Sequence, residues 1–300
     1  MELRQLKYFL RVAETLNFSV AAKELFITQS TLSQQIINLE RELDQQLFLR
    51  NSHEVLLTET GKMLIPMARE CLHNVDMLFL RVNELKQMLT GELNIGVTYS
   101  FSNMIAETMT DFIKEYPKVK LNVCYALMTE LIEKLTHHEL DFVLAFKPSI
   151  QNEHIESHVL FNNRLAAIVN EQHPLAGAKK ITLDELKTHS LALPAKGMQA
   201  RKAFETLISN KADGYNIKAE INDVAMLLKL AHQSNHVTIL SESATEGESN
   251  LRAIPIDDPQ NQMIGCIHVL KDSYTKNSAK EFINMLSQCK AVLRYKLTEY

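Results

Sequence analysis

Apolar residues between positions 17 and 48 recur at helical spacing and leave a polar face free. Four of them lie four, three and four residues apart, which places them on one side of a predicted helix: Leu32, Ile36, Leu39 and Leu43. Thr28 is positioned to cap this helix, and Ser19 is positioned to cap a shorter helix before it. Two helices joined by a tight turn predict a helix-turn-helix.

The free face of the second helix carries amide and hydroxyl side chains that suit the edges of DNA bases. Gln can hold an adenine edge through two hydrogen bonds, and Ser or Thr can reach base edges or phosphate oxygens. A first helix over about residues 3–13 should support this pair, and the segment after Phe48 reads as a two-stranded wing. A solvated helix in an ordinary bundle would show the same spacing, so that alternative stays open. The expected DNA-binding residues are Thr28, Gln29, Ser30, Thr31, Ser33, Gln34, Arg50 and His53.

A long helix should follow from about Glu59 to Leu89, with Thr58 as its cap and Pro66 near its start. Its apolar residues are spaced alternately four and three apart, which is a heptad pattern. A small N-terminal domain cannot cover so long a seam, so we expect the same helix of a second subunit to bury it. Packing against the chain's own C-terminal part is the alternative. The expected dimerisation residues are Leu64, Ala68, Cys71, Val75, Leu78, Val82, Leu85 and Leu89.

From Gly91 onward, short apolar strands alternate with helices, which predicts α/β units with parallel strands. The first unit has expected strands at 93–97, 119–123 and 142–146 and helices at 104–113 and around 131–135. The second has expected strands at 165–169, 191–193, 218–221 and 237–240 and helices at 199–208 and 224–231. A strand at 263–270 and a helix at 279–297 complete the chain.

Small molecules bind such sheets beyond the carboxyl ends of the strands, where helix N-termini offer free N–H groups. Each polar residue there would also serve as a cap without any ligand, so the prediction depends on their convergence. A carboxylate is the natural ligand, because N–H groups and hydroxyls favour anions and Lys147 lies nearby. The expected effector-binding residues are Ser100, Phe101, Ser102, Thr129, Lys147, Met198, Gln199 and Asn222.

Composition narrows the picture. The chain has 300 residues, enough for about two or three domains, and its net charge of −4 argues against indiscriminate nucleic-acid binding. Residues 1–58 carry six Lys or Arg against seven Asp or Glu, a net charge of −1, so any DNA contact depends on where the cations lie. We see no signal-peptide core and no apolar run of roughly 18 residues, so we expect a cytoplasmic protein that does not bind membranes.

Motifs for catalysis and for metal binding are missing from the sequence. It contains no GxGxxG, P-loop, GxSxG or HExxH, so we expect neither an enzyme nor a cofactor. His137 and His138, near Asp141, resemble a solvated helix end more than a metal site. The cysteines, with no CxxC pair, fit reduced thiols, although redox sensing by Cys124 or Cys266 stays an alternative. The four cysteines are Cys71, Cys124, Cys266 and Cys289.

Residues 1–61 resemble the winged helix-turn-helix of LysR-type transcriptional regulators. The segments AAKEL, QSTLSQQI, LE.ELDQQLF.R and LTETG follow that family's order and spacing. Two positions depart from it: Gln34 stands where many members have Arg, and His53 lies in a wing that is often richer in Arg. The resemblance continues more weakly through HPLA at 173–176, ITLDEL at 181–186 and LALPAKG at 191–197. It departs again at 231–243, where the family usually has two glycines and a proline.

The resemblance implies an α/β protein with an N-terminal all-α winged helix-turn-helix at 1–58 and a linker and dimerisation helix at 59–90. It implies a C-terminal effector-binding domain at 91–300, similar to type II periplasmic binding proteins. Subdomain I would comprise about 91–162 and 269–300, and subdomain II about 163–268.

The implied function is a sequence-specific transcriptional regulator that binds double-stranded promoter DNA and senses a small-molecule effector. Its implied partners are a second copy in a homodimer, further copies in a homotetramer, and RNA polymerase. From the residues alone, a cytosolic solute-binding α/β protein with a fused helical module for protein interaction is the other interpretation.

Overall fold

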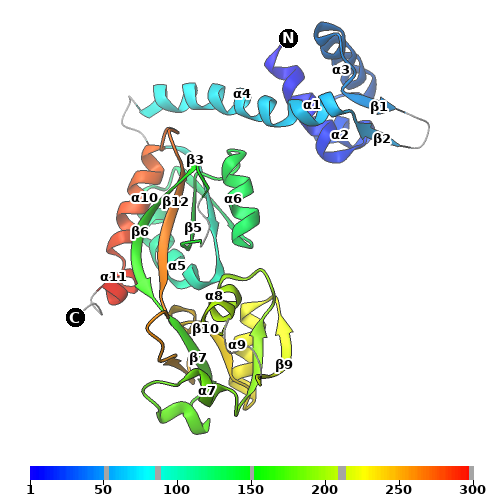
Figure 1. Ribbon diagram of the computed structural model, residues 1–300. Helices are drawn as coiled ribbons and strands as arrows, with labels where there is room; N and C mark the ends of the chain where they lie inside the picture. Colours follow the sequence, from blue (N-terminus) through cyan, green and yellow to red (C-terminus); the bar gives the residue numbers. More distant parts are fainter. Residues whose placement is uncertain (51–53, 85–88, 149–151, 209–213, 297–300) are drawn as a thin grey trace. The chain divides into compact units, whose positions relative to one another are not determined.

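The computed structural model describes residues 1–50, 54–84, 89–148, 152–208 and 214–296, and the chain divides into two units, residues 1–88 and residues 89–300 (Figure 1). In the first unit, helices and a hairpin share one core, where the rings of Phe9 and Phe18 lie 5.6 and 5.7 Å from the ring of Phe48. The expected winged helix-turn-helix is therefore present. Its elements are α1 (Leu3–Thr15), α2 (Phe18–Glu24), α3 (Gln29–Leu43), β1 (Phe48–Arg50), β2 (Val55–Leu57) and α4 (Glu59–Glu84).

Side-chain caps fix where these helices begin. The Thr28 hydroxyl accepts the Thr31 N–H at 3.2 Å and the Thr58 hydroxyl accepts the Gly61 N–H at 3.0 Å, as the sequence predicted. The prediction for Ser19 is wrong. Asn17 caps α2 instead, because the buried Phe18 already belongs to the helix and Asn17 Oδ1 accepts two N–H groups of its first turn.

Subdomain I is built on a five-stranded sheet in the order β4-β3-β5-β12-β6. As predicted, β3 is parallel to β4 and β5, whereas β12 is antiparallel to β5 and β6. The sequence pattern missed the edge strand β6, and the single final helix it predicted is broken at Cys289, whose backbone is extended. The strands are β3 (Gly91–Val97), β4 (Val119–Tyr125), β5 (Phe142–Phe146), β6 (Ile155–Asn163) and β12 (Met263–Leu270). The helices are η1 (Tyr99–Phe101), α5 (Ser102–Glu115), α6 (Met128–Thr136), α10 (Asn277–Gln288) and α11 (Lys290–Lys296).

Subdomain II is less parallel than expected. β7 pairs antiparallel with both β10 and β11, whereas β8 and β9 run parallel and Leu191 of β8 also forms an isolated parallel bridge to Val237. The helix predicted at 199–208 has the predicted bounds, while β11 was missed. The strands are β7 (Leu165–Asn170), β8 (Ser190–Pro194), β9 (Asn216–Ile221), β10 (Thr238–Ser241) and β11 (Leu251–Pro255). The helices are η2 (Pro174–Gly177), α7 (Leu183–Leu186), α8 (Gln199–Ile208), α9 (Val224–Gln233) and η3 (Glu242–Thr245).

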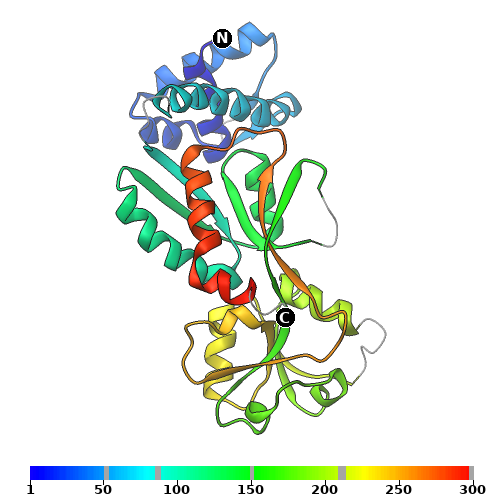
Figure 2. The same ribbon diagram turned by 90° about the vertical axis from the view of Figure 1, so that its left-hand side faces the viewer.

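The chain crosses between the subdomains twice, once from β6 to β7 and once from β11 to β12 (Figures 1 and 2). Because β12 pairs with β6 from Met263 to Leu270, the return crossing lies before Met263 and not near 269 as expected. Asn261 joins the crossings: its side chain accepts the Leu165 N–H at 2.7 Å and donates to the carbonyls of Leu165 and Ile256 at 2.9 and 2.8 Å. Both connections are thus anchored at one place.

An ion pair whose side chains are largely buried lies at the end of subdomain I where β3 and β5 begin. Lys276 Nζ lies 2.8 Å from Asp141 Oδ1 and donates to the Glu92 carbonyl at 3.0 Å, while Asp141 Oδ2 accepts the Asn94 N–H at 2.7 Å. Asp141 is therefore held by a lysine and a backbone amide. This pairing links the start of α10 to β3 and β5.

A fully buried histidine in β12 makes stability depend on pH. His268 Nδ1 lies 2.8 Å from the Ser157 hydroxyl, and its Nε2 lies 3.2 Å from the Ala145 carbonyl oxygen. Burial lowers the pKa of His268 below its ordinary value, against an opposing effect of the Ala145 hydrogen bond. The folded chain therefore keeps this ring neutral at a pH where the unfolded chain protonates it.

We predict that stability is full above about pH 6.5 and falls as the pH drops below it, by up to about 1.4 kcal/mol per pH unit from this group. His268→Gln keeps a donor for the Ala145 carbonyl but cannot titrate, so it should flatten that dependence. Urea unfolding of both proteins between pH 7.5 and pH 5.5 measures it. Equal pH slopes would contradict the assignment.

Candidate nucleic-acid interface and ligand site

Helix α3 has the two faces that the sequence predicted. Leu32, Ile36 and Leu39 are fully buried in the core of the first unit. On the outside, four residues spaced four, three and four apart form an exposed stripe, named here the α3 stripe: Ser30, Gln34, Ile37 and Arg41. The buried side holds the stripe in a fixed place on the surface of the unit.

The N-terminal turn of α3 gathers most of the expected DNA-binding residues. The Thr28 hydroxyl lies 3.0 Å from that of Ser30 and 2.8 Å from that of Thr31, and Ser19 donates to Gln29 Oε1 at 3.1 Å. Thr28, Gln29, Ser30, Thr31 and Gln34 are exposed and Ser33 is half-buried. His53 and the side chain of Arg50 lie outside the described residues.

Two arginines of the first unit are held in ion pairs with neighbouring carboxylates. Arg4 pairs with Glu2 at 3.1 Å, and Arg11 pairs with Glu14 and Glu24 at 3.1 and 3.3 Å. Arg41 remains on the α3 stripe. Lys7 and Lys23 are exposed as well, whereas the start of α3 itself carries amide and hydroxyl groups.

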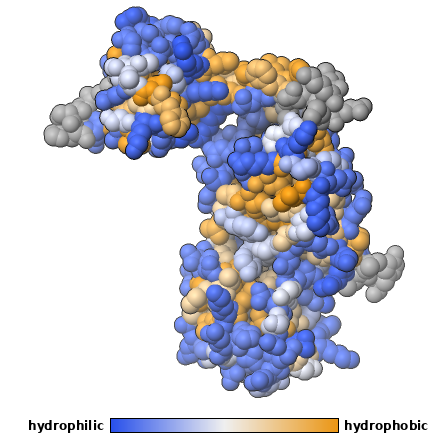
Figure 3. Space-filling view, turned by 180° about the vertical axis from the view of Figure 1, so that it is seen from behind, coloured by the Kyte–Doolittle hydropathy of each residue, from blue (hydrophilic) through white to orange (hydrophobic). Residues whose placement is uncertain are grey.

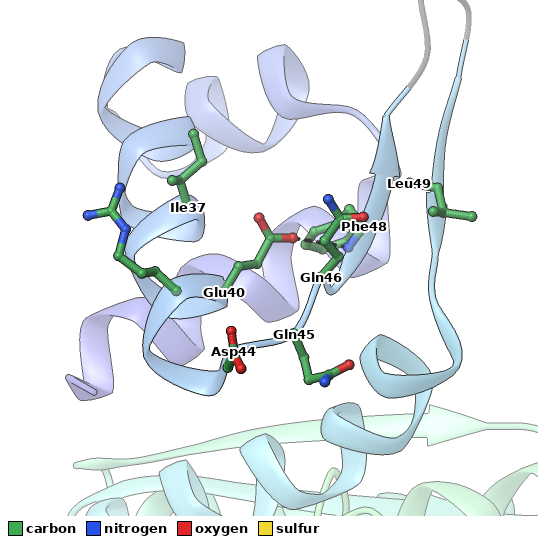
Figure 4. Close-up of a pocket in the computed structure, with 8 residues that line it drawn as sticks. Ile37, Glu40, Asp44, Gln45, Gln46, Phe48 and Leu49 are labelled. Atoms are coloured by element: carbon green, nitrogen blue, oxygen red, sulfur yellow. Dashed lines mark hydrogen bonds between the residues drawn. The ribbon is translucent and has the colours of Figure 1, made fainter.

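A hollow of about 670 Å³ lies between the C-terminal half of α3 and the wing (Figure 4). Glu40 Oε1 accepts the N–H groups of Leu47 and Phe48 at 2.9 and 3.2 Å, which fastens β1 to α3. The carboxylates of Glu40 and Asp44 make this hollow a poor place for phosphate. It is lined by Ile37, Glu40, Arg41, Asp44, Gln45, Gln46, Phe48 and Leu49.

The turn between α2 and α3 carries an unforeseen feature. Phe26 is 95% exposed and adopts a left-handed backbone conformation with φ of 55°. Because Gly or Asn is usual in that conformation, no sequence rule points to a phenylalanine there.

Only some residues of the expected heptad seam on α4 are exposed to a possible second subunit. Leu64 packs against the core of the first unit and Ala68, 1% exposed, is buried in it, so these two face their own domain and not a partner. Cys71 is exposed, Val75 is half-buried, Leu85 lies outside the described residues and Leu89 packs on the core of the second unit. A row of apolar side chains on α4 remains exposed, visible in Figure 3. Its members are Met63, Met67, Leu78, Phe79 and Val82.

Hydrogen bonds join the two subdomains beyond the carboxyl ends of β3 and β5, a place named here the subdomain junction. Ser241 of subdomain II donates to the Ser100 hydroxyl of subdomain I at 2.9 Å, and Ser243 donates to the Ser100 carbonyl at 3.3 Å. Ser241 and Ser243 were not predicted, because their partner is more than 140 residues away in the sequence.

In a second set of hydrogen bonds at the junction, one side-chain amide pairs with a backbone N–H and C=O as a neighbouring strand would. Gln199, at the start of α8, donates to the Phe146 carbonyl at 2.6 Å and accepts the Phe146 N–H at 3.1 Å. Asn103 also donates to the Glu246 carbonyl across the two subdomains. A molecule bound here would have to fit around these contacts or replace them.

Of the other expected effector residues, some lie in or against the core, one lies at a helix start and the rest lie on the surface. Phe101 is a correction: its side chain is fully buried and contacts the rings of Phe146 and Phe161 at 5.2 and 5.4 Å, so it cannot line a binding site. Ser102 donates to the Tyr99 carbonyl at 2.5 Å, and Met198 packs on the core. Thr129, Lys147 and Asn222 are exposed.

Acidic groups surround one end of the junction. Burial, and then the carboxylates of Glu248 and Asp223, raise the pKa of Tyr99. Asp223 caps α9 directly after Asn222, its Oδ1 accepting the Met226 N–H at 2.6 Å. An anion is therefore disfavoured at the end of the junction near Tyr99. A carboxylate would be better placed beside Lys147.

The cysteines are free thiols, and two of them are shielded. Burial raises the pKa of Cys266, with Lys147 opposing, and burial also raises the pKa of Cys289. A raised pKa lowers the thiolate fraction that reacts with oxidants. Cys124 is half-buried. Among the described residues, no three His, Cys, Asp or Glu side chains are grouped to hold a metal ion.

None of the helices in the described ranges is long and apolar enough to span a bilayer.

Comparison with known proteins covers nearly the whole chain. Residues 3–62 match the family described as "Bacterial regulatory helix-turn-helix protein, lysR family", and residues 86–290 match "LysR substrate binding domain". The transcriptional dual regulator GltC of Bacillus subtilis is 30% identical over 292 residues, covering 96% of this chain and 97% of GltC.

Two solved structures share the fold. CbnR in complex with its target DNA has a TM-score of 0.69 at 20% identity, over 96% of this chain and 99% of CbnR. The regulatory domain of CcmR from Synechocystis PCC6803, in complex with 2-PG, has a TM-score of 0.60 at 18% identity, over 66% of this chain and 97% of that domain.

Gln34→Ala should relax base preference at one position of a bound duplex by about 1–3 kcal/mol, because a bidentate contact to one base would be lost. Affinity for unrelated DNA should stay unchanged. Gln45→Ala, which removes another exposed amide outside α3, is the control. Competition binding against single-base variants measures the effect, and an unchanged ranking of the variants would exclude Gln34 as a base reader.

Proposed function

The chain belongs to the LysR family of transcriptional regulators, and on that premise we propose that it is a homodimer whose α3 reads the major groove and whose effector binds at the subdomain junction. It is a DNA-binding regulator with an effector-binding domain, not an enzyme. Because its target is DNA, we place it in the cytoplasm. The observation that carries the effector proposal is the pair of hydrogen-bonded contacts, Ser241 to Ser100 and Gln199 to Phe146, that link the subdomains.

The two subdomains supply the conformational equilibrium that an effector can shift. The hydrogen bonds at the junction are each worth only about 0.5–1.5 kcal/mol, although buried apolar residues of both subdomains belong to one continuous core. A small molecule that prefers one arrangement of the subdomains would shift their populations by as much as its affinity differs between the arrangements. In a dimer, that change would alter the spacing of the two copies of α3, and so of the half-sites.

We propose a small polar effector. Hydroxyl and amide groups at Ser100, Ser241 and Gln199 can donate and accept hydrogen bonds. If the effector carries a carboxylate, that group should lie towards Thr129 and Lys147, because Asp223 and Glu248 lie near Tyr99. The CcmR regulatory domain, which shares the fold, is solved with the small ligand 2-PG, in keeping with a small effector here.

The exposed row on α4 supports the dimer. Fully burying an aliphatic or aromatic side chain contributes about 1.5–3 kcal/mol, and Leu78, Phe79 and Val82 are 64%, 70% and 56% exposed. The second copy of α4 is the partner that this family membership and the heptad spacing favour. The raised pKa of Cys266 gives no support to the redox-sensing alternative.

Salt-dependent DNA binding tests the function as a whole. The purified protein should bind DNA from its own promoter region with a steep negative slope of log affinity against log salt, because phosphates release counterions. One compound from a panel of small polar metabolites should change that affinity. Binding with no salt slope would contradict the proposal for DNA, and a full panel without response would contradict it for the effector.

Leu78→Glu should weaken the dimer at least about tenfold, since a charge would be buried in an apolar interface. Sedimentation equilibrium of the full chain measures it. Leu3→Glu, at a 41% exposed leucine on α1, is the matched control and should leave the dimer intact. A Leu78→Glu protein that stays dimeric at the same concentrations would remove α4 from the interface.

Thr129→Val removes one hydroxyl while keeping the shape of the side chain, and should weaken effector binding about tenfold with DNA binding unchanged. Thr136→Val, at the other end of α6, serves as control. Titrating the wild type and the two variants with the compound found in the panel measures their affinities for it. Identical binding curves for wild type and Thr129→Val would clear Thr129 of that role.

A further inference from the structure

One side chain of the α3 stripe is apolar, although the other members of the stripe are polar. Ile37 is 37% exposed, between Gln34 and Arg41 on a face whose other members are polar. Figure 4 shows it at the rim of the hollow, with Leu49 of the wing on the far side. A partly exposed isoleucine side chain makes no hydrogen bonds with water, but it can pack against an apolar group of a binding partner.

Gln34, one turn before Ile37, is hydrogen-bonded to a neighbouring side chain, which favours one orientation of its amide. Its Nε2 donates to Asn38 Oδ1 at 3.1 Å, four residues further along the helix. One Nε2 proton and the Oε1 acceptor remain to face outward. An adenine edge presents an N7 acceptor and an N6 donor in the major groove, which is the matching pair.

Thymine is the base that offers an apolar group in the major groove, its C5 methyl. Ile37 lies three residues beyond Gln34, about 4.5 Å along the helix axis at about 1.5 Å per residue. Successive bases of one strand rise about 3.4 Å. Two side chains at this separation can therefore reach neighbouring base pairs.

We propose that Gln34, positioned by Asn38, reads an adenine, and that Ile37 packs on the methyl group of a thymine in the adjacent base pair. Asn38 is a positioning residue, because its amide acts through Gln34. The assignment rests on the proposed function, in which α3 enters the major groove. It makes Ile37 and Asn38 determinants of base preference.

The test begins with a duplex selected from a random pool by the full-length protein. Thymines are replaced one at a time by deoxyuridine, which lacks the methyl group, and adenines by 7-deazaadenine, which lacks the N7 acceptor. Binding is measured by fluorescence anisotropy at one fixed salt concentration. If no duplex is enriched over the starting pool, the proposed function fails before this inference is reached.

One deoxyuridine substitution should weaken wild-type binding roughly three- to fivefold, the effect of one lost methyl contact. The same substitution should cost Ile37→Ala less than about 1.5-fold, while Leu3→Ala, a matched exposed leucine on α1, should keep the full penalty. A duplex that is enriched but shows no deoxyuridine penalty dependent on residue 37 would overturn the assignment of Ile37.

Asn38→Ala tests the positioning role separately, and alanine also favours the helix, so folding should be kept. One 7-deazaadenine substitution, next to the thymine found above, should weaken wild-type binding at least about fivefold. In Asn38→Ala that penalty should shrink severalfold while affinity for unrelated DNA stays the same. An undiminished penalty, or an equal loss on all sequences, would overturn the role of Asn38.

Discussion

The burial of one side of α3 is the constraint on which the DNA-binding face depends. Leu32, Ile36 and Leu39 are fully enclosed by the core of the first unit, and the Thr28 cap fixes where the helix starts. Base edges differ only in the positions of a few donors, acceptors and one methyl group, so a reader must be rigid. The apolar underside of α3 supplies that rigidity, and the polar stripe supplies the chemistry.

The second unit combines one continuous apolar core, to which both subdomains contribute, with polar contacts at the subdomain junction. Asn261 anchors both crossings at one point, and the junction is closed by side chains such as Gln199 and Ser241. The proposed effector would act on these polar contacts. The helix-turn-helix and the effector-binding domain are separate units of one chain.

Periodicity in the sequence was sufficient for most of the elements but not for the contacts between them. The strands β3 and β5 and the helix α8 were predictable, because their apolar spacing is regular. The edge strand β6 was missed, since its burial alternates only over part of its length. Family resemblance supplied the domain order, the DNA-binding function and the return of the chain to subdomain I.

The candidate sites were predictable to a smaller extent. Residues at helix starts, such as Thr28 and Gln199, follow from local rules, whereas the partners of Ser100 are more than 140 residues away. Phe101 shows the limit of reasoning from strand ends, because packing decides whether a side chain at such an end faces a ligand or the core. Ile37 needed the three-dimensional core to show that it points outward.

The central claim is that the exposed edge of α3 recognises sequence and not merely charge. The most direct measurement is the ratio of affinities of the full-length protein for a selected duplex and for the same duplex with its bases scrambled, at about 0.15 M salt and with effector present. The account predicts a ratio of at least about 10³. Equal affinity for the two duplexes would contradict it.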